Sequence, residues 1–426
     1  MKTPYISHAG YAAAIALVLF SVSLVYLSIH KIIPPLQTAH IMGMVGLVFV
    51  LMLSWEYVSK SAYNKKYKLT NLYTALSDSN IMIVKSTFFR FLALFIPFYI
   101  AYFIVHNHFY FIKSDIFAPT IEFFDYLLII FLVLGPPYLF LTLKYRGAKH
   151  YEFNDYAILS IIGFKSFVCL FLCKNKTYNF YKNRRIKKVF LVYLVNFFFI
   201  TLMARFLLVE FHGFEANMNI LFSEDYNTQH WYNKARNWYF ICFHLLFVVD
   251  VGIATIGYAF ASRWLGNRTK SVDFTAMGWF VALFCYPPFN ELISGNFIYY
   301  HSLPTHEIIT SQLVWSVIFV LLLIVYTIYV WATIALGFKF SNLTNRGIIS
   351  HGPYKYVRHP AYAAKNIAWF IDSTYVLSNI WASLAFFTWN SIYILRALTE
   401  EKHLKKDKDY QSYREKVRYY FIPKII

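Results

Sequence analysis

Residues 308–336 read Ile308-Ile-Thr-Ser-Gln-Leu-Val-Trp-Ser-Val-Ile-Phe-Val-Leu-Leu-Leu-Ile-Val-Tyr-Thr-Ile-Tyr-Val-Trp-Ala-Thr-Ile-Ala-Leu336, a run without a single Asp, Glu, Lys or Arg. An α-helix needs about 20 mostly apolar residues to cross the hydrocarbon core of a membrane. This run is long enough and apolar enough, so the sequence predicts a membrane-spanning helix here.

Similar apolar runs occur on both sides of this segment. Together they predict an all-α, polytopic transmembrane helix bundle with about ten spans, at 11–29, 38–58, 88–105, 123–143, 189–209, 238–262, 274–289, 308–336, 364–378 and 380–397. Another apolar run, 157–173, carries Lys165 at its centre. It is either an eleventh span or a helix that lies in the membrane interface.

The composition of the chain supports a membrane protein. Charged residues make up 14% of the chain and hydrophobic residues 58%, whereas an average soluble protein is about 25% charged. The low charge argues against a soluble enzyme of this length, and it excludes a disordered chain, which would be polar and highly charged.

The net charge of +19 comes from basic residues that gather between the apolar runs, at 60–68, 144–149, 174–188, 263–270 and 402–418. With ten spans, and with 157–173 not crossing, all these segments lie on one side, as the positive-inside rule requires. We therefore expect both termini to be cytoplasmic, in the cell (inner) membrane. No basic face stands apart from these loops, so a nucleic-acid partner is not expected.

Several kinds of chemical site are missing from the sequence. The four cysteines lie in apolar runs without zinc-ligand or disulfide spacing, and the fourteen histidines do not form the repeated boxes of a di-iron enzyme. We therefore expect no metal. Isolated ionisable residues inside membrane spans are candidates for function by default, and here they are Glu56, Arg205, Asp250 and Asp372.

The segment Gly347-Ile-Ile-Ser-His-Gly-Pro-Tyr-Lys-Tyr-Val-Arg-His-Pro-Ala-Tyr362 is the richest in chemical groups. Gly352-Pro353 predicts a turn, and Pro360 restricts His359 to an extended conformation. The segment is thus expected to be a structured cytoplasmic loop that offers backbone donors, aromatic faces and a fixed cation. These groups suit a charged cofactor that carries an adenine.

A second polar segment follows the last two predicted spans. Arg396 and Glu400 are spaced i and i+4, so they share one face of a helix. Further on, Tyr410, Tyr413 and Val417 have helical spacing and predict an apolar stripe, with Pro423 ending the helix.

The order of these motifs resembles a known superfamily. It runs from G-P-Y-x-x-x-R-H-P-x-Y through a hairpin of two spans to E-E-x-x-L, and then to Y-x-x-Y-x-x-x-V and a late Pro. It is similar to the isoprenylcysteine carboxyl methyltransferase and phospholipid methyltransferase superfamily over about the last 90 residues. The resemblance implies a C-terminal methyltransferase-like membrane domain, residues 307–426, with a cofactor-binding loop and a helical hairpin at the cytoplasmic face. Residues 1–306 then form an N-terminal transmembrane bundle of unknown role.

The resemblance also implies an activity and a site. S-adenosylmethionine would be the cofactor, and a lipid or a prenylated, amphipathic molecule would accept the methyl group. Arg396 would orient the acceptor. The residues implied in cofactor binding are Arg346, Gly347, Ile348, Ile349, Tyr354, His359, Pro360, Ala361, Tyr362 and Glu400.

The chain departs from the family pattern after His359-Pro360, where Tyr362-Ala363-Ala364 stands in place of Tyr-x-Gly and Lys365-Asn366 follows. This departure suggests a subfamily with a different acceptor. A carboxylate or phosphate acceptor needs only a cation to hold it, whereas an amine also needs a base. Glu401 and Asp372 are the candidates for such a base.

Two other functions remain open at this point. Sterol reductases that use NADPH have a similar length and C-terminal arrangement, but their Asn-Tyr-x-Gly-Asp after Arg-His is replaced here by Pro-Ala-Tyr-Ala-Ala. A non-enzymatic ten-span transporter would show inverted repeats and paired broken helices, and the sequence has neither.

Overall fold

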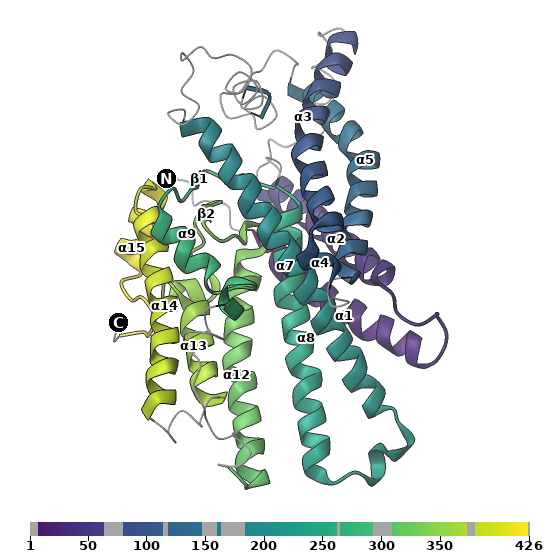
Figure 1. Cartoon of the computed structure of the whole chain (residues 1–426), viewed down its shortest axis with the longest axis vertical. Helices are drawn as coiled ribbons and strands as arrows, with labels where there is room; N and C mark the ends of the chain where they lie inside the picture. Colours follow the sequence, from purple (N-terminus) through teal and green to yellow (C-terminus); the bar gives the residue numbers. More distant parts are fainter. Residues whose placement is uncertain are drawn as a thin grey trace. The chain divides into compact units, whose positions relative to one another are not determined.

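The computed structural model describes residues 7–63, 80–113, 118–146, 160–162, 184–261, 265–292, 309–372 and 380–424. These residues form an all-α fold of the polytopic membrane type (Figure 1). The α-helices are α1 (Ala9–Ile29), α2 (Thr38–Tyr63), α3 (Asn80–Asn107), α4 (Phe109–Ile112), α5 (Ala118–Arg146), α7 (Arg184–Leu221), α8 (Trp231–Ala259), α9 (Ala276–Leu283), α12 (Gln312–Leu336), α13 (Pro360–Asp372), α14 (Ile380–Leu404) and α15 (Lys408–Lys416).

Short elements connect these helices. Three of them are 3-10 turns: η4 (Glu224–Thr228), η5 (Gly337–Lys339) and η6 (Gly352–Lys355). Two strands of two residues each, β1 (Ser271–Val272) and β2 (Thr344–Asn345), pair antiparallel, with Ser271 opposite Asn345 and Val272 opposite Thr344.

Seven helices in the described part of the chain are long and apolar enough to cross a membrane. They are α1, α2, α3, α5, α7, α8 and α12, and each coincides with a span predicted from the sequence. The prediction of an integral, multi-pass membrane protein is therefore confirmed.

The other three predicted spans are not confirmed. In place of a span at 274–289 the chain forms α9, whose eight residues rise only about 12 Å, and turns follow up to Pro288. Helix α13 covers the first part of the predicted span 364–378, whose residues 373–379 lie outside the described residues. Helix α14 contains 380–397 but continues into the charged segment. Most of the run 157–173 also lies outside the described residues.

The chain divides into two compact units, residues 57–201 and residues 1–56 with 202–426. Within the smaller unit, α3 packs along α5 (Figure 1). Stacked phenylalanine rings fill this contact, with Phe91, Phe95 and Phe98 of α3 around Phe131 of α5. At the end of the pair, Asp125 accepts hydrogen bonds from Tyr102 and interacts with His106. His106 thus lies in the last turn of α3 and helps to join it to α5.

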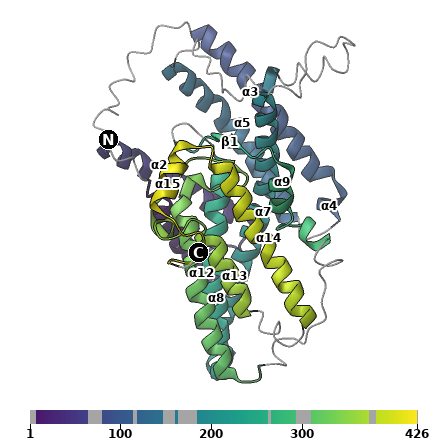
Figure 2. The same ribbon diagram turned by 90° about the vertical axis from the view of Figure 1, so that its left-hand side faces the viewer.

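In the larger unit, α8 and α12 form the centre. Helix α8 packs against α12 and α1, α12 packs against α13, and α14 contacts α13 and α9 (Figures 1 and 2). Helix α1 approaches α12 closely because Gly10 has no side chain: a Cβ there would lie 1.9 Å from the carbonyl oxygen of Ile334. The boundary expected at 306/307 lies inside this unit, so a functional division there stays a prediction.

Asp250 links the two central helices. Its carboxylate, on α8, accepts a hydrogen bond from Thr333 Oγ1 at 2.5 Å and another from the Tyr329 hydroxyl at 3.2 Å, both on α12. The side chain is buried. Its hydrogen bonds therefore give Asp250 a part in the packing of α8 against α12.

The loop between α12 and α13 is structured, as predicted. Pairing of β2 with β1 holds its first part, η6 forms at Gly352–Lys355, and the backbone N–H groups of Arg358 and His359 donate to the carbonyls of Tyr419 and Tyr420. The loop ends earlier than expected, because Pro360 begins α13. Proline is favoured at the first position of a helix, where its missing N–H is not needed.

Candidate functional site

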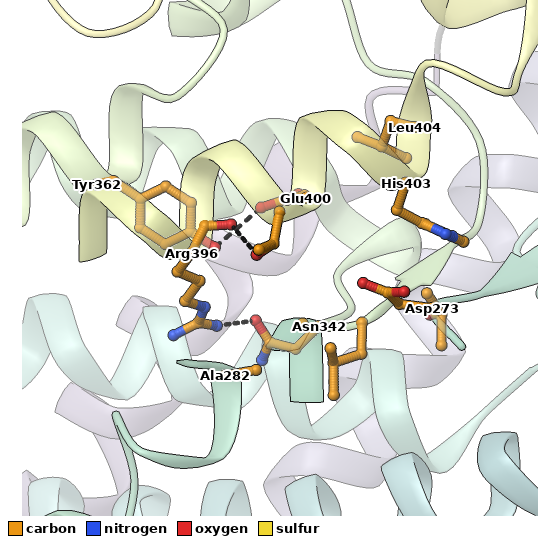
Figure 3. A pocket seen from close by; sticks show the side chains of 12 residues that line it. Asp273, Ala282, Asn342, Tyr362, Arg396, Glu400, His403 and Leu404 are labelled. Carbon is orange, nitrogen blue, oxygen red and sulfur yellow. Dashed lines mark hydrogen bonds between the residues drawn. The ribbon is translucent and has the colours of Figure 1, made fainter. Parts of the chain in front are cut away.

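A pocket that is open in part to solvent lies in the larger unit where four segments meet (Figure 3). These segments are α9 with the residues before it, the chain around β2, the first turn of α13 and the C-terminal half of α14. The lining residues are Asp273, Gly278, Ala282, Asn342, Leu343, Thr344, Tyr362, Arg396, Thr399, Glu400, His403 and Leu404.

Arg396 is a buried cation at one end of this pocket. Its side chain is 6% exposed, and its guanidinium donates through Nη2 to Asn342 Oδ1 and, at 3.4 Å, to the Tyr286 hydroxyl. The rings of Tyr286 and Tyr362 lie 5.2 and 5.3 Å from the guanidinium carbon. Within the described residues Arg396 forms no ion pair, so the pairing with Glu400 allowed by their i, i+4 spacing is not made.

Glu400 lies one turn further along α14 and bonds to Tyr362. The Tyr362 hydroxyl donates to Glu400 Oε2 at 2.9 Å, which ties the first turn of α13 to α14 (Figure 3). The other carboxylate oxygen, Oε1, has no hydrogen-bond partner among the described residues. Tyr362, Arg396 and Glu400 therefore lie together, as the resemblance implied for these three positions.

Asp273 and His403 line the other end of the pocket. Asp273 Oδ1 accepts from the backbone N–H and the hydroxyl of Thr275, at 2.9 and 2.8 Å. Thr275 is in turn the N-cap of α9. His403 contacts the Ser271 hydroxyl through Nε2 at 3.0 Å. These contacts join β1, α9 and α14.

Glu401, the second residue of the Glu-Glu pair, faces away from the pocket. It is 1% exposed, accepts from Arg358 Nε at 2.5 Å and from the Tyr410 hydroxyl at 2.8 Å, and lies 3.5 Å from His359 Nε2. Burial alone would raise the pKa of Glu401, but the contacts with His359, Tyr410 and Arg358 outweigh it and lower the pKa to about 2. These contacts therefore hold Glu401 in its ionised form inside the protein.

Arg358 connects Glu401 to the C-terminal segment. Its Nη1 donates to the carbonyls of Val417 and Arg418, at 2.8 and 2.6 Å, and its guanidinium lies 3.9 Å from the centre of the Tyr420 ring. His359 is buried beside it, with its ring stacked near Tyr362. Through Arg358, the Arg-His-Pro motif thus joins α14 to the C-terminal segment.

The structure does not place the other predicted cofactor residues at the pocket. Arg346 is buried and donates a hydrogen bond to the carbonyl of Gly257, near the end of α8. Gly347 has a positive φ of 118°, and its Cα lies close to the side chain of Lys339. Ile348 and Tyr354 pack against the cluster formed by Tyr410, Tyr413 and Val417. Four more residues predicted to bind the cofactor do not line the pocket either: Ile349, His359, Pro360 and Ala361.

The predicted apolar stripe of the C-terminal tail is confirmed. Tyr410, Tyr413 and Val417 form one buried cluster, and the Tyr413 hydroxyl donates to the carbonyl of Tyr354 at 2.7 Å. The helix ends at Lys416, before Val417 and well before Pro423, so the expected end at Pro423 was wrong.

Lys365, the unusual residue after the motif, does not line the pocket. Its ammonium lies 5.0 Å from the centre of the Trp369 ring, and 5.9 and 5.6 Å from the centres of the Tyr329 and Tyr393 rings.

The sequence did not point to three residues that line the pocket, Asn342, Asp273 and His403. The pairing of β1 with β2 and the packing of α9 against α14 bring Asp273 near α14, and two-residue strands leave no pattern in the sequence.

Among the described residues no three His, Cys, Asp or Glu side chains are grouped as metal ligands. In a comparison with protein families, residues 313–406 match the isoprenylcysteine carboxyl methyltransferase (ICMT) family. The C-terminal region is thus similar to a family of membrane methyltransferases, as the motif order indicated. No curated protein and no solved structure matches the chain.

Proposed function

We propose that the protein is an S-adenosylmethionine-dependent methyltransferase that methylates a lipid or a prenylated, amphipathic acceptor at the membrane surface. The observation that carries this proposal is the pocket formed by Tyr362, Arg396 and Glu400 inside the region that matches the methyltransferase family. Tyr362 comes from one motif, and Arg396 and Glu400 come from a second motif further along the chain.

The side chains of the pocket fit this cofactor. Its sulfonium and ammonium groups are positive, and Glu400 offers a carboxylate whose Oε1 is free among the described residues. The Tyr362 ring offers an aromatic face. When bound, the cofactor supplies a methyl group that is already activated for transfer, so the protein mainly has to align the acceptor.

Arg396 is the group that would hold the acceptor. A buried cation without an acidic partner is unfavourable unless a ligand supplies the negative charge, and both of its hydrogen bonds to described residues use Nη2. Nε and Nη1 have no partner among the described residues and could donate charge-assisted hydrogen bonds to the oxygens of a carboxylate or phosphate. Leu395 and Leu398 beside it are 39% and 45% exposed, which suits an acceptor with an apolar tail.

Neither proposed base supports an amine acceptor. Glu401 is held by Arg358, and Asp372 lies ten residues beyond Tyr362 on α13, about 15 Å along the helix axis. Neither residue lines the pocket. An acceptor that is already an anion, such as a carboxylate, needs no base and is favoured.

The finer description of the fold belongs to this proposal. It comprises ten spans, cytoplasmic termini, the cell (inner) membrane, a cofactor loop at the cytoplasmic face, and a division into residues 1–306 and 307–426. The remaining residues implied by the resemblance, such as His359 and Tyr354, would support the cofactor site from behind its lining.

Ligand-dependent thermal unfolding of the purified protein in detergent tests the function. A ligand that binds the native state raises the unfolding temperature, so S-adenosylhomocysteine should stabilise the protein and NADPH should not. Glu400→Gln should weaken this stabilisation. Stabilisation by NADPH alone would favour the reductase, and stabilisation by neither ligand would favour the transporter. Lipids from cells with and without the protein should differ by a species about 14 Da heavier, the mass that a methyl group adds.

A further inference from the structure

The end of the pocket opposite Arg396 contains a second carboxylate, and it comes from outside the region that matches the family. Asp273 lies between β1 and α9, and it is 4% exposed. Gly278 of α9 leaves room for it, since a Cβ at that position would lie 2.0 Å from Asp273 Oδ2. Residues upstream of the methyltransferase-like region therefore complete its pocket.

The two oxygens of Asp273 have different surroundings. Oδ1 receives both hydrogen bonds from Thr275 and thereby holds the start of α9. Oδ2 receives none from the described residues, and Asp273 forms no ion pair with them. Lys270, the nearest lysine in sequence, pairs instead with Asp407 and Asp409. A buried carboxylate that is not compensated by a cation is unfavourable, which points to a positive group in the ligand.

His403 gives a second, independent indication of a ligand at this end. Its side chain is 7% exposed, and its Nδ1 has no hydrogen-bond partner, while Nε2 contacts Ser271. Burial lowers the pKa of His403, and nearby Asp273 opposes that change only in part. The ring is therefore neutral at pH 7 and does not balance the charges of Asp273 and Glu400.

We propose that Asp273 binds the ammonium group of the cofactor's amino-acid part, with His403 completing the polar end of the pocket. The pocket would then have a positive end at Arg396 and a negative end at Asp273, with Glu400 between them beside Tyr362 (Figure 3). This inference rests on the proposed function. It gives the upstream bundle a direct part in cofactor binding.

The variant Asp273→Asn tests this assignment. Asparagine keeps an oxygen for the hydrogen bonds from Thr275, so α9 should remain capped, and only the charge is lost. The dissociation constants of S-adenosylhomocysteine and of its analogue without the amino group are measured for the full-length protein in detergent. Asp225→Asn removes the same charge from an exposed position in η4 and is the matched control.

We expect Asp273→Asn to weaken binding of S-adenosylhomocysteine about tenfold or more, the range of a hydrogen bond to a charged group. Binding of the deaminated analogue should not change, and the control should behave like the wild type. Equal binding of S-adenosylhomocysteine by the variant and the wild type would overturn the inference, and so would equal weakening of both ligands. If the wild type does not bind S-adenosylhomocysteine at all, the proposed function itself is wrong.

Discussion

Arg396 shows how a side chain with one obvious neighbour in the sequence can have other partners in the fold. The i, i+4 spacing places Glu400 on the same face of α14, yet Glu400 bonds to Tyr362 and Arg396 bonds to Asn342. An exposed ion pair would contribute only about 0.3–0.5 kcal/mol. A buried guanidinium held by a neutral amide instead keeps its charge available for a ligand.

This arrangement predicts the effect of Arg396→Lys. Lysine keeps the charge but lacks the planar fork that fixes two oxygens. We expect cofactor binding to be unchanged and methyl transfer to fall by about tenfold or more, because a misplaced acceptor loses the alignment that the reaction needs. Single-turnover assays with membrane lipid as acceptor, beside a cofactor-binding measurement, check this.

Arg414→Lys is the matched control, since Arg414 is exposed on α15. It should leave both measurements unchanged. Turnover of Arg396→Lys close to that of the wild type would remove Arg396 from the acceptor site and assign it to packing.

At the residue scale the sequence predicted three members of the pocket, Tyr362, Arg396 and Glu400, because they stand in motifs whose order is specific. It did not separate residues that line the pocket from those that support it. His359 and Glu401 belong to the same motifs, but their burial and their contacts with Arg358 and the tail depend on the path of residues 417–421. That path cannot be derived from local spacing.

At the scale of the elements, the contact between α1 and α12 leaves no room for a side chain at Gly10. A methyl group at Gly10 would meet the backbone oxygen of Ile334, and backbone cannot move aside as the end of a flexible side chain can. At Gly43 on α2 a Cβ would have nothing within 4 Å. The two glycines therefore form a natural pair for comparison.

We expect Gly10→Ala to lower the unfolding temperature and Gly43→Ala to leave it unchanged or raise it. Alanine in a helix interior is favoured over glycine by about 1 kcal/mol, so a loss at Gly10 must come from the displaced helix. Thermal unfolding of the two variants in the same detergent measures the difference. Equal unfolding temperatures would show that α1 and α12 can separate without loss of stability.

A comparison of the predicted spans with the observed helices shows which helices a sequence pattern can locate. Apolar runs located α1, α8 and α12 closely, because the membrane requires a minimum length of apolar helix. The span predicted by the same criterion at 274–289 is not confirmed, because α9 is short and turns follow it. A helix that lines a pocket is not bound by that requirement.

For the whole molecule, the prediction that remains is topology. If all basic segments are cytoplasmic, single cysteines introduced at positions 66, 185 and 406 should react with membrane-impermeant reagents from the same side. Labelling of position 185 from outside, with position 66 labelled from inside, would show that 157–173 crosses the membrane. Ten spans would then be wrong.

The contact between Gly10 and Ile334 also has a consequence for how the chain is made. Helix α1 leaves the ribosome about 300 residues before α12, which at about 5–20 residues per second is a delay of about 15–60 s. During that time the face of α1 that contains Ala9, Gly10 and Ala13 lacks its final partner. Faces of small residues promote association between helices in membranes. A nascent chain therefore carries a first helix on which Gly10 is not packed against Ile334 until α12 has been made.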